Sequence, residues 1–256
     1  MDASEAQFTR HLLERFTADA GRVVPLEALW AHGSLALGDY QPGRSDLDLV
    51  ALVGSPVTGP QRKQLEELHR TLISQVPEAA GLHCSYVVRS QLPEAGRDHV
   101  TWAQSRLFER PVTPVSRREL STGGLSLFGP GPAGLVAEVT DRELAEFVRG
   151  DLKGFWYPAS ARPSLWLRDI WVDLGLLTLA RASVTLRDGR LITKGQALEV
   201  LAEWGAPDEV VRDIHHRRYG TGPHRTSDAW RIRRGRLARA FVRTGIERTL
   251  ASRLGP

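Results

Sequence analysis

Residues 46–53, which read DLDLVALV, constrain the fold of this chain more than any other segment. In a β-strand, side chains alternate between two faces, so Asp46, Asp48 and Val50 share one face and Leu47, Leu49 and Ala51 share the other. Two neighbouring carboxylates on one face are unfavourable unless a cation lies between them. The segment therefore predicts a strand with one apolar face and one polar, cation-binding face.

Four further segments indicate the elements around this strand. Apolar residues recur at helical spacing in residues 6–16 and 60–75. Residues 28–32 and 82–88 are short apolar runs of the kind that form strands. This alternation of strands and helices predicts a domain in which a sheet is packed against helices and keeps one face polar.

The second half of the chain has a different pattern. Residues 121–134 contain five glycines and two prolines, which predicts an irregular linker. The linker has neither the Lys-Ser/Thr ending of a P-loop nor the glycine spacing of a dinucleotide-binding loop. After it, apolar residues at intervals of three and four predict helices at residues 141–155, 165–182, 193–204, 208–219 and 227–251. We expect this half to be a helical bundle.

Positive charge is concentrated at the end of the chain. Residues 208–256 contain 12 basic and 5 acidic residues, whereas residues 1–207 contain 22 and 25. Clustered arginine is typical of nucleic-acid binding, and RNA binding by this segment remains an alternative. We interpret its arginines as a solvated helix face and do not expect a nucleic-acid partner. These arginines are Arg231, Arg233, Arg234, Arg236, Arg239 and Arg243.

Cysteine content and hydropathy exclude several classes of protein. Cys84 is the only cysteine, which excludes a disulfide framework and a cysteine-based zinc site. The first twenty residues contain scattered acidic residues and lack the apolar core of a signal peptide. No segment approaches the roughly 18 consecutive apolar residues of a membrane-spanning helix. We expect a cytoplasmic protein with no membrane partner.

Gly33 and Ser34 lie between two predicted strands, where a phosphate-binding turn is expected. Glycine lets the backbone approach a phosphate closely, and serine adds a hydroxyl and an amide that bind phosphate oxygens. Mg²⁺ prefers hard oxygen ligands and usually keeps water and phosphate oxygens in its remaining positions. Together with Asp46 and Asp48, the turn predicts a site for Mg²⁺ and a substrate phosphate.

The string HGSLALGDYQPGRSDLDLVALV resembles the signature of the polymerase-beta-type nucleotidyltransferases, in which Gly-Ser and a short helix precede Asp-x-Asp on a strand. Over most of its length the chain is most similar to the streptomycin/spectinomycin adenylyltransferases of that superfamily. This resemblance implies an α+β fold, with a mixed sheet and helices in a nucleotidyltransferase domain at residues 1–135. It also implies a helical domain at residues 136–256 that forms the other wall of a cleft for ATP and acceptor.

The reaction implied by the resemblance is transfer of AMP from ATP to a hydroxyl of a small molecule, an aminoglycoside-type antibiotic. Asp46 and Asp48 would hold Mg²⁺ against the triphosphate, and Gly33 and Ser34 would bind its terminal phosphates. Three residues of the second half match nucleotide-binding positions of the family, namely Arg181, Lys194 and Tyr219.

His83 stands where the family carries its catalytic glutamate, and no acidic residue occurs between Glu78 and Glu94. A neutral imidazole can accept the proton of the acceptor hydroxyl, although it is not a hard-oxygen ligand for Mg²⁺. We favour an active enzyme with His83 as the base. Two alternatives remain open: a catalytically silent nucleotide-binding relative with a regulatory, protein or RNA partner, and a His83 that is merely a strand residue.

A cationic acceptor needs acidic side chains for charge pairing and aromatic rings for stacking. The residues proposed for this role lie near the start of the second predicted helix of the bundle, and are Trp166, Asp169, Trp171 and Asp173. The alternative is that the tryptophans are core residues. The expected partners are ATP and a hydroxylated, cationic small molecule, bound by a monomer.

Overall fold

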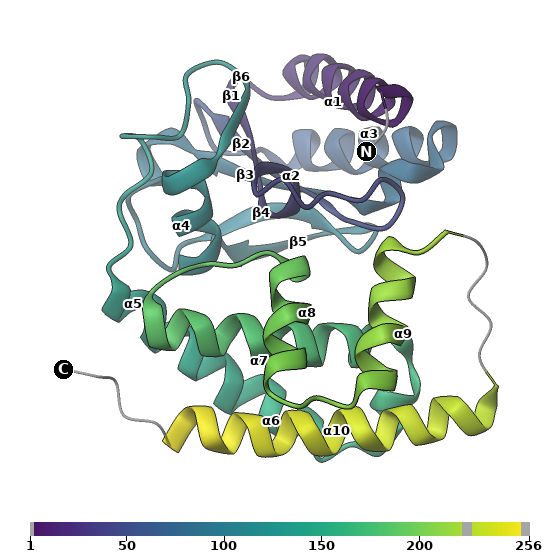
Figure 1. Ribbon diagram of the computed structural model, residues 1–256. Helices are drawn as coiled ribbons and strands as arrows, with labels where there is room; N and C mark the ends of the chain where they lie inside the picture. Colours follow the sequence, from purple (N-terminus) through teal and green to yellow (C-terminus); the bar gives the residue numbers. More distant parts are fainter. Residues whose placement is uncertain (1–2, 222–226, 252–256) are drawn as a thin grey trace. The chain divides into compact units, whose positions relative to one another are not determined.

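The computed structural model describes residues 3–221 and 227–251. The chain divides into two compact units, Met1–Val139 and Thr140–Pro256, which are coloured from purple to teal and from teal to yellow in Figure 1. The first unit contains a six-stranded sheet with helices, and the second is helical. The fold is therefore α+β, as the sequence predicted.

The sheet of the first unit is mixed, with the strand order β5-β4-β3-β2-β1-β6. The strands are β1 (Leu26–His32), β2 (Leu47–Val53), β3 (Leu82–Val88), β4 (Asp98–Ala103), β5 (Arg106–Pro111) and β6 (Leu125–Phe128). β2 and β3 are parallel, and the other four pairs are antiparallel. The helix α3 (Gly59–Gln75) connects the parallel pair, as a crossover connection requires.

Alternation along β2 divides its side chains between two apolar clusters. Leu47, Leu49 and Ala51 lie in one cluster with residues of α1 (Ala3–Val23) and α3. Val50 lies in the other, with Leu120 of α4 (Pro114–Gly123). The polar face predicted for this strand is therefore confined to its start, where Asp48 lies, because α4 covers the face beyond it.

The second unit contains the five helices that the sequence predicted, with different ends. They are α5 (Asp141–Asp151), α7 (Asp169–Asp188), α8 (Lys194–Glu203), α9 (Asp208–Tyr219) and α10 (Asp228–Ala251), with a π-helical turn (Leu152–Trp156) and the short α6 (Tyr157–Ser160) between the first two. α7 begins four residues later than predicted because Pro163–Leu167 form a 3₁₀ turn. α7 ends at Asp188 and is capped by Gly189, whose φ is +67°. None of the described helices combines the length and apolar character that a membrane crossing requires.

The segment predicted as a linker instead contains the edge strand β6. Phe128 and Ser126 are the register partners of Leu29 and Trp30 in β1. Gly129 follows with a φ of +69°, and a Cβ there would lie 2.1 Å from the carbonyl oxygen of Glu27. The glycines of this segment therefore let the chain approach β1 closely, and the second unit starts at Thr140, four residues after the expected start.

Candidate active site

Asp48 lies between two histidines on one face of the sheet. Its register partners are His32 in β1 and His83 in β3. Side chains of directly opposite residues project from the same face of a sheet. Nδ1 of His83 lies 3.4 Å from Oδ1 of Asp48. The row His32, Asp48 and His83 is the polar centre of the first unit.

The Gly33–Ser34 turn lies directly against the Asp48 carboxylate. Gly33 is the first residue of the short helix α2 (Gly33–Ala36), and its φ is +63°. A Cβ at this position would lie 2.8 Å from Oδ2 of Asp48. Glycine is therefore required both for the left-handed backbone and for the close approach of the carboxylate. The structure thus brings together the two halves of the sequence motif.

Asp46 immediately precedes β2 and contributes negative charge to the same region. A Cβ on Gly81 would lie 3.5 Å from Oδ1 of Asp46. Burial lowers the pKa of His83, but the hydrogen bond to Asp48 and the charges of Asp46 and Asp48 outweigh burial and the opposing charge of Arg110. The pKa of His83 is consequently raised above its ordinary value of 6.5.

Glu119 belongs to this site although the sequence analysis did not single it out. It lies on α4, and its Oε2 is 2.9 Å from Nδ1 of His32. The Glu119 and His32 side chains are only 7% and 12% exposed. No local motif signals such a pair, because the two residues are 87 positions apart in the chain.

The three residues of the second unit predicted to bind nucleotide occupy two places. Nε of Arg181 donates to the carbonyl oxygen of Ile192 at 2.9 Å, two residues before Lys194. Lys194 is the first residue of α8, whose N-cap is Thr193. Tyr219 is the last residue of α9, and its hydroxyl accepts a hydrogen bond from Nε of Arg218 at 3.0 Å. Arg181 and Lys194 thus flank one turn, and Tyr219 lies on a separate helix.

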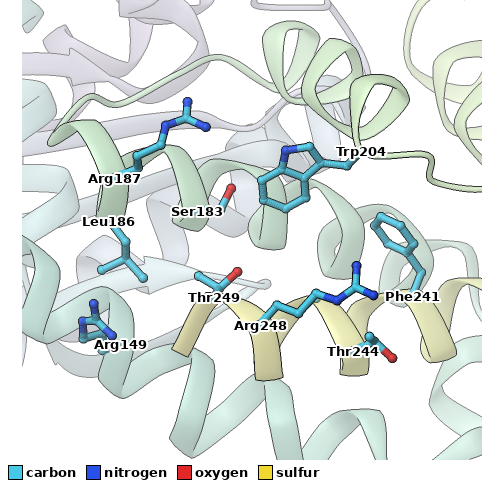
Figure 2. Close-up of a pocket in the computed structure, with 10 residues that line it drawn as sticks. Arg149, Ser183, Leu186, Arg187, Trp204, Phe241, Thr244, Arg248 and Thr249 are labelled. Carbon is cyan, nitrogen blue, oxygen red and sulfur yellow. The ribbon is translucent and has the colours of Figure 1, made fainter. Parts of the chain in front are cut away.

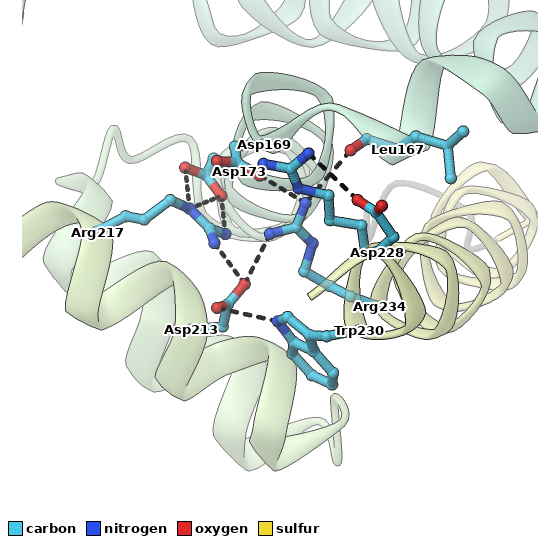
Figure 3. Close-up of polar contacts among 9 residues, drawn as sticks. Leu167, Asp169, Asp173, Asp213, Arg217, Asp228, Trp230 and Arg234 are labelled. Atoms are coloured by element: carbon cyan, nitrogen blue, oxygen red, sulfur yellow. Dashed lines mark hydrogen bonds and ion pairs between the residues drawn. The ribbon is translucent and has the colours of Figure 1, made fainter. Parts of the chain in front are cut away.

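The two carboxylates predicted to bind a cationic acceptor are paired with arginines of the same unit (Figure 3). Asp169 accepts a hydrogen bond from Arg234 at 2.6 Å, and Asp173 accepts from Arg217 at 2.5 Å. Asp213 accepts from both arginines and joins the two pairs. Arg234, predicted to lie on a solvated helix face, is instead fully buried in this network.

The two tryptophans predicted for the acceptor site differ in their surroundings. Trp166 is fully buried, and its Nε1 donates to the carbonyl oxygen of Ala159 at 3.1 Å. Its ring lies so close to Gly175 that a Cβ there would be 2.5 Å from the indole, so it is a core residue. Trp171 is half-buried and stacks on Phe155, with 5.9 Å between ring centroids.

A pocket of about 580 Å³ lies within the second unit, between α7 and α10 (Figure 2). Arg187, Trp204, Phe241 and Arg248 are among the residues that line it. Of the described residues that line this pocket, none was predicted to bind nucleotide or acceptor. It is therefore separate from the predicted site residues of that unit.

Comparison with known proteins gives one family match in the first unit and one similar solved structure. Residues 13–109 match the model of the nucleotidyltransferase domain family, a range that contains the Gly-Ser turn, both aspartates and His83. None of the curated proteins compared with the chain matches it. Among solved structures, the chain is similar to spectinomycin adenyltransferase AAD(9) from Enterococcus faecialis, solved with ATP and spectinomycin. The two are 13% identical, with a TM-score of 0.68 over 96% of this chain and 100% of that chain, which shows a shared fold.

Proposed function

We propose that this chain, which carries a nucleotidyltransferase domain, is a metal-dependent enzyme that transfers AMP from ATP to a hydroxyl of a small molecule. The observation that carries the proposal is the contact between the Gly33 backbone and the Asp48 carboxylate, which joins a phosphate-binding turn to a metal-binding group. Similarity in fold to an adenyltransferase solved with ATP supports the same class of reaction.

The side chains of this site fit a divalent cation that is bound partly by protein carboxylates and partly by phosphate oxygens of a nucleotide. In the described part of the chain no three His, Cys, Asp or Glu side chains form a ready metal site. Asp46 and Asp48 would therefore be the protein ligands, and phosphate oxygens and water would complete the shell, as Mg²⁺ commonly allows. The cation would neutralise charge on the triphosphate.

The predicted nucleotide-binding residues are each proposed to have a separate role. The amide and hydroxyl of Ser34 would bind the terminal phosphates, next to Gly33. Arg181 and Lys194 would stabilise the negative charge of the departing pyrophosphate, since fixed cations there favour the transition state. Tyr219 is proposed to contact the nucleotide.

His83 is proposed as the proton acceptor. Its Nδ1 faces Asp48, which leaves Nε2 as the ring nitrogen that can take the proton from the acceptor hydroxyl. In the metal-free chain, the hydrogen bond to Asp48 and the charges of both aspartates raise the pKa of His83 above its ordinary value.

The acceptor is proposed to be a hydroxylated small molecule, and aminoglycosides are the first class to test because of the similarity to a spectinomycin adenyltransferase. Asp169 and Asp173 already pair with Arg234 and Arg217, so a polycationic acceptor would compete with two arginines for them. Trp171 is the remaining proposed acceptor contact of this region. Uncharged hydroxylated molecules therefore belong in the same panel.

The test is incubation with ATP, Mg²⁺ and this panel, with release of pyrophosphate and the mass of the modified acceptor as readouts. The Asp46→Asn, Asp48→Asn double variant should lose both signals. Asp19→Asn, which changes a partly buried aspartate of α1 that pairs with Arg22, is the matched control and should keep them. Pyrophosphate release that persists in the double variant would contradict the proposal.

A second candidate, a catalytically silent nucleotide-binding relative, is favoured by one observation, the histidine at the position of the family's glutamate. It predicts nucleotide binding without turnover. RNA as its partner is disfavoured by contacts within the chain, because Arg233 pairs with Glu209 and Arg239 donates to the carbonyl oxygen of Ser160.

A further inference from the structure

Glu119 and His32 form a nearly buried pair beside the proposed nucleotide site. Their hydrogen bond is 2.9 Å long, from Nδ1 of His32 to Oε2 of Glu119. His32 is the last residue of β1 and immediately precedes Gly33. Its register partner is Asp48, so the imidazole projects from the same face as the Asp48 carboxylate.

The pair is not explained by local structure. The His32 side chain makes no capping hydrogen bond to α2, whose start is set by the left-handed backbone of Gly33. A carboxylate withdrawn from water destabilises a fold unless it is paired, and apolar residues of similar volume are often at least as stabilising as a buried ion pair. Placing Glu119 here therefore has a stability cost that an apolar side chain would avoid.

We propose that Glu119 is a positioning residue of the nucleotidyl-transfer site, acting through His32, whose Nε2 contacts the triphosphate at the Gly33–Ser34 turn. The inference rests on the proposed function, since it assumes that ATP binds at this turn. It assigns roles to two residues that the sequence motif does not include.

The physical basis is the orientation of an imidazole by a carboxylate. A hydrogen bond from Nδ1 to Glu119 makes Nδ1 the donor and fixes the plane of the ring, which leaves Nε2 for a second partner. A buried carboxylate orients the catalytic histidine of serine proteases in the same way. A ring held in advance loses less freedom when a ligand binds, so affinity rises.

The two histidines beside Asp48 would thus have different tasks. Nδ1 of His83 faces the carboxylate of Asp48, whereas Nδ1 of His32 faces the carboxylate of Glu119. Loss of Glu119 should therefore weaken nucleotide binding more than it slows proton transfer, and KM for ATP should change more than kcat.

The experiment measures binding of a non-hydrolysable ATP analogue with Mg²⁺ by calorimetry, together with kcat and KM for ATP. The variants are Glu119→Ala, Glu119→Gln, His32→Gln and the double variant Glu119→Ala, His32→Gln. The first and third should each bind the analogue about tenfold more weakly, the effect of losing one hydrogen bond to a charged group. The double variant should bind no more weakly than His32→Gln, because Glu119 acts through His32.

Glu119→Gln should show a smaller loss, because its amide oxygen still accepts from Nδ1 and its shape is unchanged. It also serves if Glu119→Ala fails to fold, which thermal unfolding of each variant will show. The matched control is Glu109→Gln, which removes an exposed carboxylate paired with Arg62 in the same unit and should not alter binding.

Unchanged analogue binding in a folded Glu119 variant would overturn the inference, as would additive losses in the double variant. If the wild-type chain binds no analogue, the proposed function fails with it. If the wild type binds and the Glu119 variants bind equally well, only the positioning role fails.

Discussion

Nδ1 of His83 lies 3.4 Å from Oδ1 of Asp48, so the side chain at the expected base position is in contact with an expected metal ligand. A histidine there differs from a glutamate in its titration, because it is an effective base only when neutral. Because the pKa of His83 is raised in the metal-free chain, its ring becomes neutral only at a higher pH than a free imidazole does.

The dependence of kcat on pH follows from this contact. Without bound metal, the hydrogen bond to Asp48 and the charges of Asp46 and Asp48 hold the pKa of His83 above 6.5, and a cation bound to these carboxylates would weaken both effects. We therefore expect kcat to rise with pH as the ring loses its proton, with a midpoint below the pKa of the same ring in the metal-free chain. The measurements are a pH–rate profile at saturating ATP and acceptor and an NMR titration of the imidazole without Mg²⁺. His83→Gln should remove the midpoint and most of the activity, and a profile that keeps the midpoint would contradict the role of His83.

Replacing His83 with glutamate distinguishes the hypothesis of an active enzyme from that of a catalytically silent relative. A fall in rate in His83→Glu would identify the histidine as a working base, because a carboxylate has a different pKa and reach. A gain of turnover over an inactive wild type would instead support the silent relative. Nucleotide affinity of the variant, measured in parallel, shows whether the site is intact.

Substitution of Gly33 tests the contact between turn and carboxylate. Gly33→Ala puts a Cβ 2.8 Å from Oδ2 of Asp48 and should abolish nucleotidyl transfer. The left-handed backbone alone costs about 1–2 kcal/mol for alanine. Gly96→Ala is the matched control, since Gly96 has a φ of +78° with nothing within 4 Å of its Cβ position. Gly96→Ala should show a similar loss of stability and keep its activity. Equal activity in the two variants would contradict the claim that nucleotidyl transfer needs the close approach of Gly33 to Asp48.

His69 should make the first unit less stable in acid. Burial, with a smaller contribution from the charge of His83, lowers the pKa of His69 to about 3. The unfolded chain takes up a proton below pH 6.5 that the folded chain excludes, so stability falls as pH drops from 6.5 towards 3. The slope is about 1.4 kcal/mol per pH unit. Urea unfolding at several pH values should show a shallower slope for His69→Gln, and parallel curves would contradict this origin.

The buried arginine of α10 should matter far more than its neighbour. Arg234→Met removes a buried guanidinium that donates to Asp169 and Asp213, and should cost roughly 1.5–3 kcal/mol, since Asp213 keeps its pair with Arg217. Arg233→Met removes an exposed pair with Glu209 and should cost less than about 1 kcal/mol. Urea unfolding of the two variants provides the comparison. Similar losses in both would show that the network does not stabilise the unit.

The strands that the sequence predicted are those with strong local signals, and the missed ones lack them. The hairpin of β4 and β5 turns at Gln104 and Ser105, whose φ values are +53° and +58°. Such turns are usually marked by Asn-Gly or Asp-Gly, so this hairpin has no recognisable turn signal. β6 was missed because glycine and proline surround it, and its pairing with β1 determines its conformation.

The site residues likewise divide into those with a local sequence signal and those without one. Gly33 and Asp48 lie in one continuous motif, and the structure places them in contact. Asp173 was assigned to an acceptor site from local composition, but its partner Arg217 lies 44 residues further along the chain. Glu119 had no local signal, because only the packing of α4 against β1 brings it to His32.

The pairing of β6 with β1 determines where this domain can be cut. A fragment ending at residue 109, where the family match ends, would keep the Gly-Ser turn, both aspartates and His83. It would lack α4 and β6, and would expose the hydrogen-bonding edge of β1, which lies next to the turn. Such an edge is a template for pairing with other chains, so aggregation of that fragment would reflect its boundary rather than an incapacity of the domain.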